Sequence, residues 1–213
     1  MEILSKLFGS SARVKILRLF LFNKNKIFDI NKIAYRTKVS VFVARKELVM
    51  MENIEFVKRK IFYKTVERIS GSKTIKSKRK VAGWIVNEKF LYLKPLYQFL
   101  INATPLKSKE IEKRINRIGA VKLIIVSGVF IQDWDSRVDM LIVGDKLKKS
   151  NLESTIKSIE AEVGKELRYA TFSTEDFKYR LNIYDKLVRD ILDYPHEVVM
   201  DRIGFFVDSR TSQ

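Results

Sequence analysis

Residues 29–57, DINKIAYRTKVSVFVARKELVMMENIEFV, decide the fold of the first half of the chain. They predict two short helices joined by a tight turn at residues 36–39, after which the chain enters a strand. Asp29 and Ser40 place side-chain oxygens where the two helices need N-caps. The second helix has apolar residues at spacings of three and four, which share one buried stripe: Val43 or Ala44, Leu48, Met51 and Ile54.

Four residues near the start of the second helix fall outside the buried stripe and are expected to be exposed: Val41, Phe42, Arg45 and Lys46. Two helices around a tight turn, with an exposed and partly basic start to the second, form the pattern of a helix-turn-helix. In that motif the second helix offers its N-terminal residues to the major groove of DNA. The pattern therefore predicts a DNA-reading element.

The segments SSARVKILRLF (residues 10–20) and RTKVSVFVARKEL (36–48) resemble the winged-helix domains of bacterial transcription regulators. The resemblance implies a three-helix core followed by a β-hairpin, which is called the wing. Many such regulators have a glycine before an apolar pair at the end of the second helix of the motif. This chain has Glu55 at that position.

The first helix of this core is expected from Ala12 to about Phe22, capped by Ser10 or Ser11. A polar turn follows, and then residues 27–28 form a short extended pair. In winged-helix proteins such a pair often joins the wing as a third strand.

Residues 56–86 predict the wing itself. Apolar residues alternate in a strand that starts at Phe56, Val81 and Trp84 mark the returning strand, and Ser70-Gly71-Ser72 lies between them as a turn. Basic residues crowd the chain after this turn: Lys73, Lys76, Lys78, Arg79 and Lys80. Because like charges this close repel one another, an anionic partner such as nucleic-acid phosphate would relieve the repulsion. The alternative is a solvated loop that binds nothing.

The positive charge of the chain is concentrated in its first half. Residues 1–94 hold 23 Lys and Arg against 7 Asp and Glu, a net +16, whereas residues 95–213 hold 19 against 18, a net +1. A charge that served only solubility would have no reason to divide in this way. A nucleic-acid footprint on the first half explains the division.

The whole chain of 213 residues has room for one large or two small domains. It contains no cysteine, which excludes disulfides and thiolate sites, and it has no apolar run long enough to span a membrane. The N-terminal segment carries charges within its apolar part and lacks a small-residue cleavage site, so we expect a folded helix instead of a signal peptide. These features predict a cytoplasmic protein.

Residues 87–101 predict a strongly apolar helix, kinked or divided by Pro95, that packs between the two halves or forms a dimer interface. A further helix is expected from Lys109 to Ile118, capped by Ser108 and ended by Gly119.

From residue 120 onward the pattern becomes that of a small α/β domain with a short mixed sheet. Three apolar runs predict its strands, at residues 121–126, 138–143 and 167–172. One helix is expected from Ser150 to Val163, and another from about residue 173 to 191.

This order of elements resembles the minimal nucleotidyltransferases of the DNA polymerase beta-like superfamily. The family has Gly-Ser at the end of the first strand and Asp-x-Asp on the second, where carboxylates hold magnesium ions. Here the first pair is inverted as Ser127-Gly128, and the segment from Ser136 to Asp139 places Arg137 where the first ligand should be. A guanidinium cannot bind a cation. The resemblance therefore implies a degenerate domain without catalytic, metal or cofactor residues.

Arg137 has two interpretations. It pairs with Asp139, Asp135 or Asp133 to close the former cleft, or it binds an anion such as a nucleotide phosphate. The single histidine, His196, lacks partners for metal binding or for general-base catalysis and is interpreted as a packing or capping residue. The tail from residue 208 onward is expected to fray.

Together these features predict an α+β protein with a winged-helix domain at residues 1–87, a helical connector at 88–118 and a degenerate nucleotidyltransferase-like domain at 119–213. The expected function is sequence-specific transcription regulation, with double-stranded DNA as the partner and a homodimer as the binding form. Candidate DNA contacts are Arg36, Lys38, Ser40, Val41, Phe42, Arg45, Lys46, Lys58, Arg59, Lys60, Lys73, Lys76, Lys78, Arg79 and Lys80. The remnant of a nucleotide site would comprise Ser127, Gly128, Ser136, Arg137 and Asp139. An active nucleotidyltransferase, and a second half that binds a nucleotide or a protein, are the alternatives.

Overall fold

The computed structural model describes residues 3–70, 73–101 and 106–206, with residues 66–70 and 73–75 described by their backbone alone. The chain divides into two compact units. The first comprises Met1–Ile101 and Ala161–Lys165, and the second comprises Asn102–Glu160 and Glu166–Gln213. Helices occur together with small sheets, which confirms the expected α+β class. Among the described residues, no helix is both long enough and apolar enough to cross a membrane.

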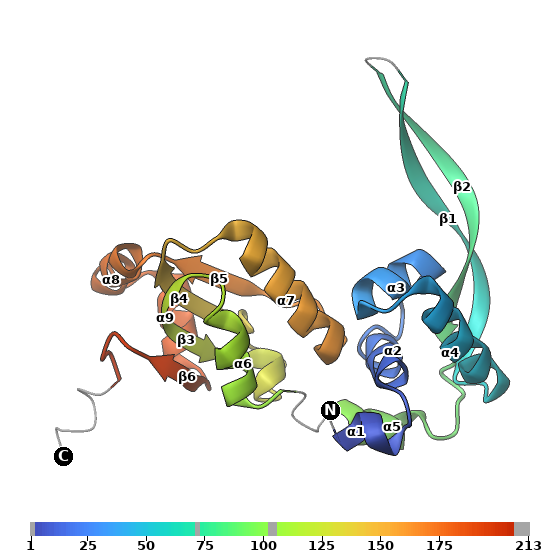
Figure 1. Ribbon diagram of the computed structural model, residues 1–213, viewed down its shortest axis with the longest axis horizontal. Helices are drawn as coiled ribbons and strands as arrows, with labels where there is room; N and C mark the ends of the chain where they lie inside the picture. The colour runs from blue at the N-terminus through green and yellow to red at the C-terminus, as the bar shows by residue number, and fades with distance from the viewer. Residues whose placement is uncertain (1–2, 71–72, 102–105, 207–213) are drawn as a thin grey trace. The chain divides into compact units, whose positions relative to one another are not determined.

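The first unit opens with four helices: α1 (Ile3–Leu7), α2 (Ser11–Phe22), α3 (Ile30–Thr37) and α4 (Val41–Asn53). The three expected N-caps are confirmed, because the side-chain oxygens of Ser10, Asp29 and Ser40 each accept a hydrogen bond from the amide three residues later. Lys38, at the end of α3, adopts a left-handed conformation with φ of 52°, which turns the chain sharply toward α4. Figure 1 shows α2, α3 and α4 packed together.

The core of the first unit lies where α2, α3 and α4 meet the start of the hairpin. Leu48 and Met51, which the sequence placed on the buried stripe of α4, are fully buried, whereas Ile54 is exposed. Phe20 makes edge-on ring contacts with Phe28 and Phe56, with centroid distances of 5.8 and 6.4 Å. Such pairs add to the stabilisation that comes from apolar burial alone.

Arg18 of α2 is a charged residue inside this core, with only 1% of its surface exposed. Its guanidinium donates hydrogen bonds to the carbonyl oxygens of Leu100 and Glu162, both of which belong to the first unit. A buried cation is costly unless it is hydrogen-bonded, so these carbonyls explain how it is tolerated.

The hairpin consists of β1 (Val57–Ser70) and β2 (Lys73–Val86), paired antiparallel in one continuous register from Val57↔Val86 to Ser70↔Lys73. At about 3.4 Å per residue, each strand is about 45 Å long. Figure 1 shows the hairpin projecting from the helices of its unit. The basic residues that follow the expected turn, for which the sequence left a solvated loop open, instead lie on β2: Lys73, Lys76 and residues 78–80. Part of the expected turn, residues 71–72, lies outside the described residues.

Residues 28–29 join the hairpin to the helices. Phe28 forms an isolated antiparallel bridge with Trp84, so the extended pair expected at residues 27–28 meets the hairpin at one residue and the sheet stays two-stranded. The Asp29 carboxylate, besides capping α3, accepts a hydrogen bond from the Lys64 ammonium at 2.7 Å. Burial acts to raise the pKa of Asp29, but hydrogen bonds from Lys64 and from the Lys32 amide outweigh it, and the pKa is lowered.

After the hairpin, the expected helix from residue 87 is wrong at its start. α5 (Leu93–Ile101) begins six residues later, and residues 88–92 form turns. Pro95 is the third residue of α5 and does not kink it, because an amide in the first turn has no partner within the helix. Leu100 and Ile101 pack into the core of the first unit.

The second unit begins with α6 (Ser108–Ile115), so the expected connector at 88–118 is divided between the two units. Ser108 does not cap α6, as the sequence had predicted. The N-cap position is Lys107, and the Ser108 hydroxyl donates to the Glu197 carboxylate.

A four-stranded mixed sheet forms the centre of the second unit, in the order β5 (Tyr169–Phe172), β4 (Met140–Asp145), β3 (Ala120–Val126), β6 (Glu197–Asp201). β4 pairs parallel with β5 and antiparallel with β3, which confirms the expected short mixed sheet. Strand β6, which pairs antiparallel with β3, was not expected from the sequence. The short 3-10 helix η1 (Gly128–Phe130) follows β3.

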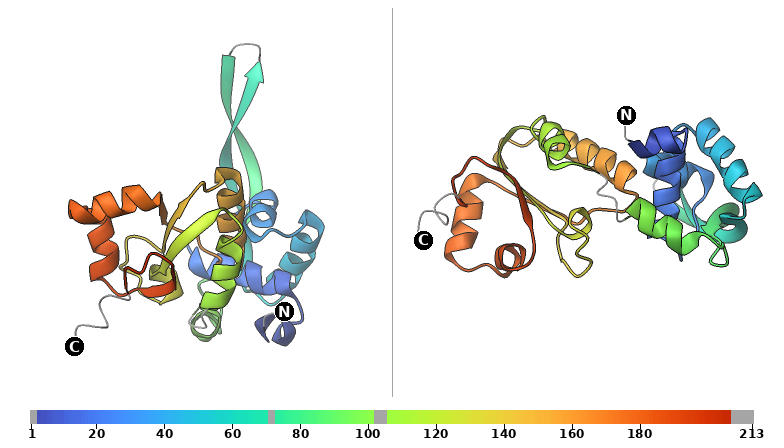
Figure 2. Two further views of the ribbon diagram at one scale, coloured as in Figure 1. Left: turned by 60° about the vertical axis from the view of Figure 1, so that its left-hand side comes forward. Right: turned by 90° about the horizontal axis from the view of Figure 1, so that it is seen from below.

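Helices lie on both faces of this sheet (Figure 2). Phe177, Val188 and Ile191, from α8 (Thr174–Asn182) and α9 (Lys186–Asp193), pack against the alternate residues Leu123 and Ile125 of β3. Figure 2 shows α6 and α7 (Lys149–Val163) on the opposite face.

The single helix expected at residues 173–191 is wrong. The chain breaks between α8 and α9, where Tyr184 is left-handed with φ of 56° and Asp185 caps α9 through the amides of Leu187 and Val188. α8 is fixed to the sheet by Asp145 at the end of β4, whose carboxylate accepts the amide and hydroxyl of Thr174. The hydrogen bond from the Lys122 ammonium, with those from Thr174, lowers the pKa of Asp145 to about 2.

Glu55 generates the first prediction. It follows the end of α4 with φ of 61°, a left-handed conformation that costs a residue with a Cβ about 1–2 kcal/mol and glycine very little. Replacing Glu55 with glycine should therefore raise the free energy of unfolding by about 1 kcal/mol, measured by urea denaturation. Lys46→Gly, within α4, is the control and should lower the same free energy by about 1 kcal/mol. A loss of stability in Glu55→Gly would contradict the prediction.

Candidate nucleic-acid interface

The first turn of α4 presents an apolar surface to solvent. Phe42 is 79% exposed, and its neighbours Val41 and Val43 are 38% and 36% exposed. One turn later, Arg45 and Lys46 are also exposed. Residues three and four positions apart lie on the same side of a helix, so both cations flank Phe42. The sequence had placed Val41, Phe42, Arg45 and Lys46 together on an exposed surface, and the exposed fractions confirm it.

The turn before α4 divides into exposed and buried residues. Lys38 is exposed, and Ser40 is exposed with its hydroxyl accepting the Val43 amide at 3.2 Å. Arg36 differs from the other candidates, because only 7% of its surface is exposed. Its side chain therefore belongs to the interior of the unit and does not lie on this surface.

Cations occupy both faces of the hairpin. Cross-strand partners share a face, so the register places Lys64 with Arg79 on one face and Thr65 with Lys78 on the other. The described and exposed cations along the hairpin are Lys58, Arg59, Lys60, Lys64, Lys76, Lys78, Arg79 and Lys80. The side chain of Lys73 lies outside the described part.

Two of these cations already have carboxylate partners. The Arg59 guanidinium donates to both oxygens of Glu52 at 2.7 and 3.2 Å and lies 5.7 Å from the ring centre of Trp84. Lys64 bonds to Asp29, as described above. These contacts hold the hairpin against α4 and α3, so Arg59 is less available for phosphate than the sequence suggested.

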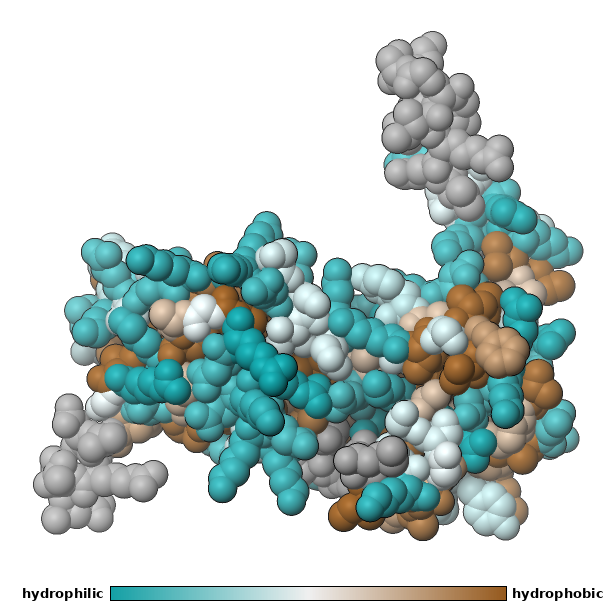
Figure 3. Space-filling model, viewed as in Figure 1, coloured by the Kyte–Doolittle hydropathy of each residue, from teal (hydrophilic) through white to brown (hydrophobic). Residues whose placement is uncertain are grey.

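Sequence reasoning missed two exposed residues on the hairpin, Ile61 and Tyr63. Tyr63 is paired with Lys80 across the hairpin, and Ile61 with Ala82. They flank Phe62 within a strand that the sequence predicted, but the sequence did not indicate that their side chains would be exposed. Figure 3 shows hydrophilic residues along the described hairpin and hydrophobic ones gathering where the hairpin meets the helices of its unit.

In the second unit, Asp139 points into the protein. It is fully buried, and its carboxylate accepts the amides of Val129 at 3.1 Å and Arg168 at 2.9 Å, and the Arg168 guanidinium at 3.3 Å. The carboxylate therefore fastens the turn after β3 to the chain entering β5. A charge buried in this way needs these donors.

Three other residues of the expected nucleotide-site remnant, Ser127, Gly128 and Ser136, lie close to Asp139 or to its neighbour Val138. The hydroxyls of Ser127 and Ser136 both donate to the carbonyl of Val138. Gly128 has φ of +56°, and a Cβ at this position would lie 2.2 Å from the Asp139 carboxylate. Glycine is thus required by the inward direction of Asp139.

Arg137 pairs with none of the expected carboxylates at 133, 135 and 139. Its guanidinium lies 2.9 Å from the carboxylate of Asp190 on α9. The expected partners were wrong because the topology brings α9 against the start of β4. The interpretation as a structural ion pair agrees with this contact, although the partner differs. Among the described residues, no group of three His, Asp or Glu side chains is arranged to hold a metal ion.

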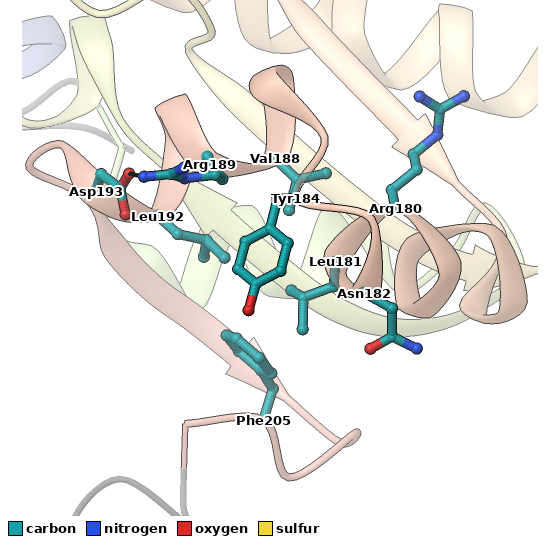
Figure 4. A pocket seen from close by; sticks show the side chains of 9 residues that line it. All are labelled: Arg180, Leu181, Asn182, Tyr184, Val188, Arg189, Leu192, Asp193 and Phe205. Carbon is teal, nitrogen blue, oxygen red and sulfur yellow. Dashed lines mark hydrogen bonds and ion pairs between the residues drawn. The ribbon is translucent and has the colours of Figure 1, made fainter.

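A hollow of about 510 Å³ lies between α8, α9 and Phe205 in the second unit. Figure 4 shows the Tyr184 ring among Leu181, Leu192 and Phe205. The guanidinium groups at its border already pair with carboxylates, Arg180 with Asp176 and Asp185, and Arg189 with Asp193. The hydrogen bond to Asp176, with the charge of Asp185, raises the pKa of Arg180. His196 lies outside this hollow, with its Nδ1 2.8 Å from the carbonyl oxygen of Tyr194.

Comparison of the chain with protein-family models, with curated proteins and with solved structures gave no match. The function is therefore inferred from the residues and their geometry.

Asp139 generates the second prediction. Asp139→Asn replaces one acceptor oxygen with an amide donor that faces backbone amides, so the free energy of unfolding should fall by about 2–4 kcal/mol in urea denaturation. The matched control is Asp135→Asn, an exposed position in the same loop, which should change it by less than about 0.5 kcal/mol. Equal stability of the wild-type protein and Asp139→Asn would show that the carboxylate has no structural role.

Proposed function

We propose that this protein is a sequence-specific DNA-binding transcription regulator whose first unit is a winged helix that reads the major groove with α4. The observation that carries the proposal is the exposed first turn of α4, with Arg45 and Lys46 beside Phe42, on the half of the chain that holds nearly all of the net positive charge. An α-helix fits the major groove, and only there does each base pair present a distinct pattern of groups.

The residues divide into two roles. Phe42, Arg45 and Lys46 face base edges, with Ser40 and Val41 beside them. The cations of the turn and hairpin contact phosphates and fix the position of α4 on the duplex: Lys38, Lys58, Lys60, Lys76, Lys78, Arg79 and Lys80. Arg36 is omitted because it is buried, and Arg59 is assigned to the contact with Glu52.

The hairpin supports the proposal through its length and charge. Its two 14-residue strands carry exposed cations on both faces, and these cations lie close together along the ribbon. Repulsion between the cations destabilises this arrangement in water, and a polyanion lowers the repulsion when it binds. A homodimer is part of the proposal, because one recognition helix contacts too few base pairs for high specificity.

For the second unit we propose a nucleotidyltransferase-like domain without catalytic activity, serving oligomerisation or the binding of a ligand or partner. Magnesium catalysis needs several carboxylate oxygens directed to one open site. Asp139 directs its oxygens at backbone amides and at Arg168, and Arg137 stands two residues before it. Both features argue against a bound magnesium ion at this point.

The rival function is an active nucleotidyltransferase directed to its target by the first unit. The observation that favours it is the Ser127-Gly128 turn beside the buried carboxylate of Asp139. Incubation with labelled nucleoside triphosphates and magnesium tests it. Incorporation that Asp139→Asn abolishes, while Asp135→Asn retains it, would establish the rival, provided that circular dichroism shows both variants folded.

The proposed function is tested by selection of bound duplexes from a random-sequence library at two salt concentrations. An enriched motif with two spaced half-sites is the expected result. Binding without enrichment, which weakens sharply at the higher salt concentration, would reduce the protein to a non-specific DNA-binding protein. Absence of binding would overturn the proposal.

Arg45 generates the third prediction. Arg45→Ala should weaken binding to the selected duplex by about tenfold to a hundredfold, and binding to a scrambled duplex by less than about threefold, measured by fluorescence anisotropy. Lys26→Ala, which removes an exposed cation from the turn between α2 and α3, should weaken both equally. Equal losses on both duplexes for Arg45→Ala would place Arg45 on the phosphate backbone.

The hairpin generates the fourth prediction. Glutamine at Lys76, Lys78, Arg79 and Lys80 together should lower the slope of log K against log salt concentration by about 3–4, because fewer counterions are released from DNA. The control carries the same change of charge at four exposed lysines of the second unit: Lys109, Lys113, Lys178 and Lys186. An unchanged slope in the hairpin variant, or an equal decrease in the control, would contradict a specific role of the hairpin.

A further inference from the structure

We propose that α4 recognises the 5-methyl groups of thymine through Phe42, so that the protein selects duplex sites with thymine under the first turn of this helix. The inference rests on the proposed function and deepens it by naming the chemical group that is read. It begins from the residue types at positions 41–43, which are Val, Phe and Val.

The first turn of α4 offers apolar contact and few hydrogen-bonding side chains. Residues 41–43 have none, and the Ser40 hydroxyl already accepts the Val43 amide as the N-cap. Among the groups that the major groove displays, the thymine 5-methyl is the one that is apolar. An exposed phenylalanine is suited to cover that methyl and cannot satisfy the polar edges of the other bases.

The exposure of this turn has no structural explanation within the first unit. Phe20 and Phe56 are fully buried in the same unit, whereas the Phe42 side chain is 79% exposed. Three consecutive exposed apolar residues on a helix are unfavourable in water unless a partner covers them. With 79% of its surface exposed, the Phe42 ring adds little to the core, so contact with a partner accounts for its size.

Charge decides the kind of partner. Arg45 and Lys46 lie on the same side of α4 as Phe42, Lys38 is exposed in the preceding turn, and residues 1–94 carry a net +16. A second copy docking with this surface would bring like charges together at considerable cost. A duplex instead surrounds its base edges with phosphates, which complements an apolar centre bordered by cations.

The test compares thymine with uracil in the same duplex. The selected duplex is made with every dT replaced by dU, which removes the methyl groups and leaves the base-pairing and hydrogen-bonding edges unchanged. Binding of the wild-type protein should weaken about fourfold for each methyl group that Phe42 covers. Phe42→Ala should bind the dT duplex more weakly than the wild type does and should bind the dT and dU duplexes equally.

The matched control is Tyr35→Ala, which removes another exposed aromatic side chain from the same unit. It should keep the full dependence on thymine. An effect of dU on the shape of the duplex would act on all three proteins alike, and Phe42→Ala would then retain it. Urea denaturation should show equal stability for wild type and Phe42→Ala, because the replaced side chain is exposed.

Three results would overturn the inference. The first is equal binding of dT and dU duplexes by the wild-type protein. The second is a dependence on thymine that Phe42→Ala retains. The third is dissociation of a homodimer by Phe42→Ala in sedimentation, which would place Phe42 at a protein interface. Failure of the proposed function itself appears differently, as absence of binding to the dT duplex.

Discussion

The first unit depends on residues 28–29, which join the hairpin to the helices. Phe28 hydrogen-bonds to the backbone of Trp84, and Asp29 both caps α3 and bonds to Lys64. A two-stranded ribbon has no core of its own and is marginally stable in isolation. The direction of the hairpin relative to α4 is therefore fixed at its base, by these contacts and by the pairing of Arg59 with Glu52.

Much of the first unit was predictable because its determinants are local. Each cap, at Ser10, Asp29 and Ser40, is a hydrogen bond between a side chain and the amide three residues later. A capping residue that precedes apolar residues at helical spacing can be recognised in the sequence. The length of the hairpin was not predictable in the same way. Alternation of apolar and polar residues indicates a strand with one buried face. A ribbon with cations on both faces buries little side-chain surface, so its lysine-rich part shows no such alternation and is not distinguished from a loop.

In the second unit, several features depend on contacts between residues that lie far apart in the sequence. The break between α8 and α9 contains neither glycine nor proline, and it is held by Tyr184 in a left-handed conformation and by the Asp185 cap. Arg137 meets Asp190, 53 residues later, which local spacing cannot predict. The inward direction of Asp139 likewise depends on the amide of Arg168, brought near by the parallel pairing of β4 with β5. Strand β6 was missed because its short apolar run after Pro195 has a clear role only beside β3.

The unbroken register of the hairpin limits how such an arm can change during evolution. From Val57↔Val86 to Ser70↔Lys73 the pairing shows no bulge, so each residue has a fixed face and a fixed partner. Loss of one residue from a single strand would move every later side chain of that strand to the opposite face. A change of length within the arm therefore keeps the faces of the outer residues only if each strand gains or loses two residues, a step of about 7 Å. The length of the hairpin is therefore expected to change in fixed steps.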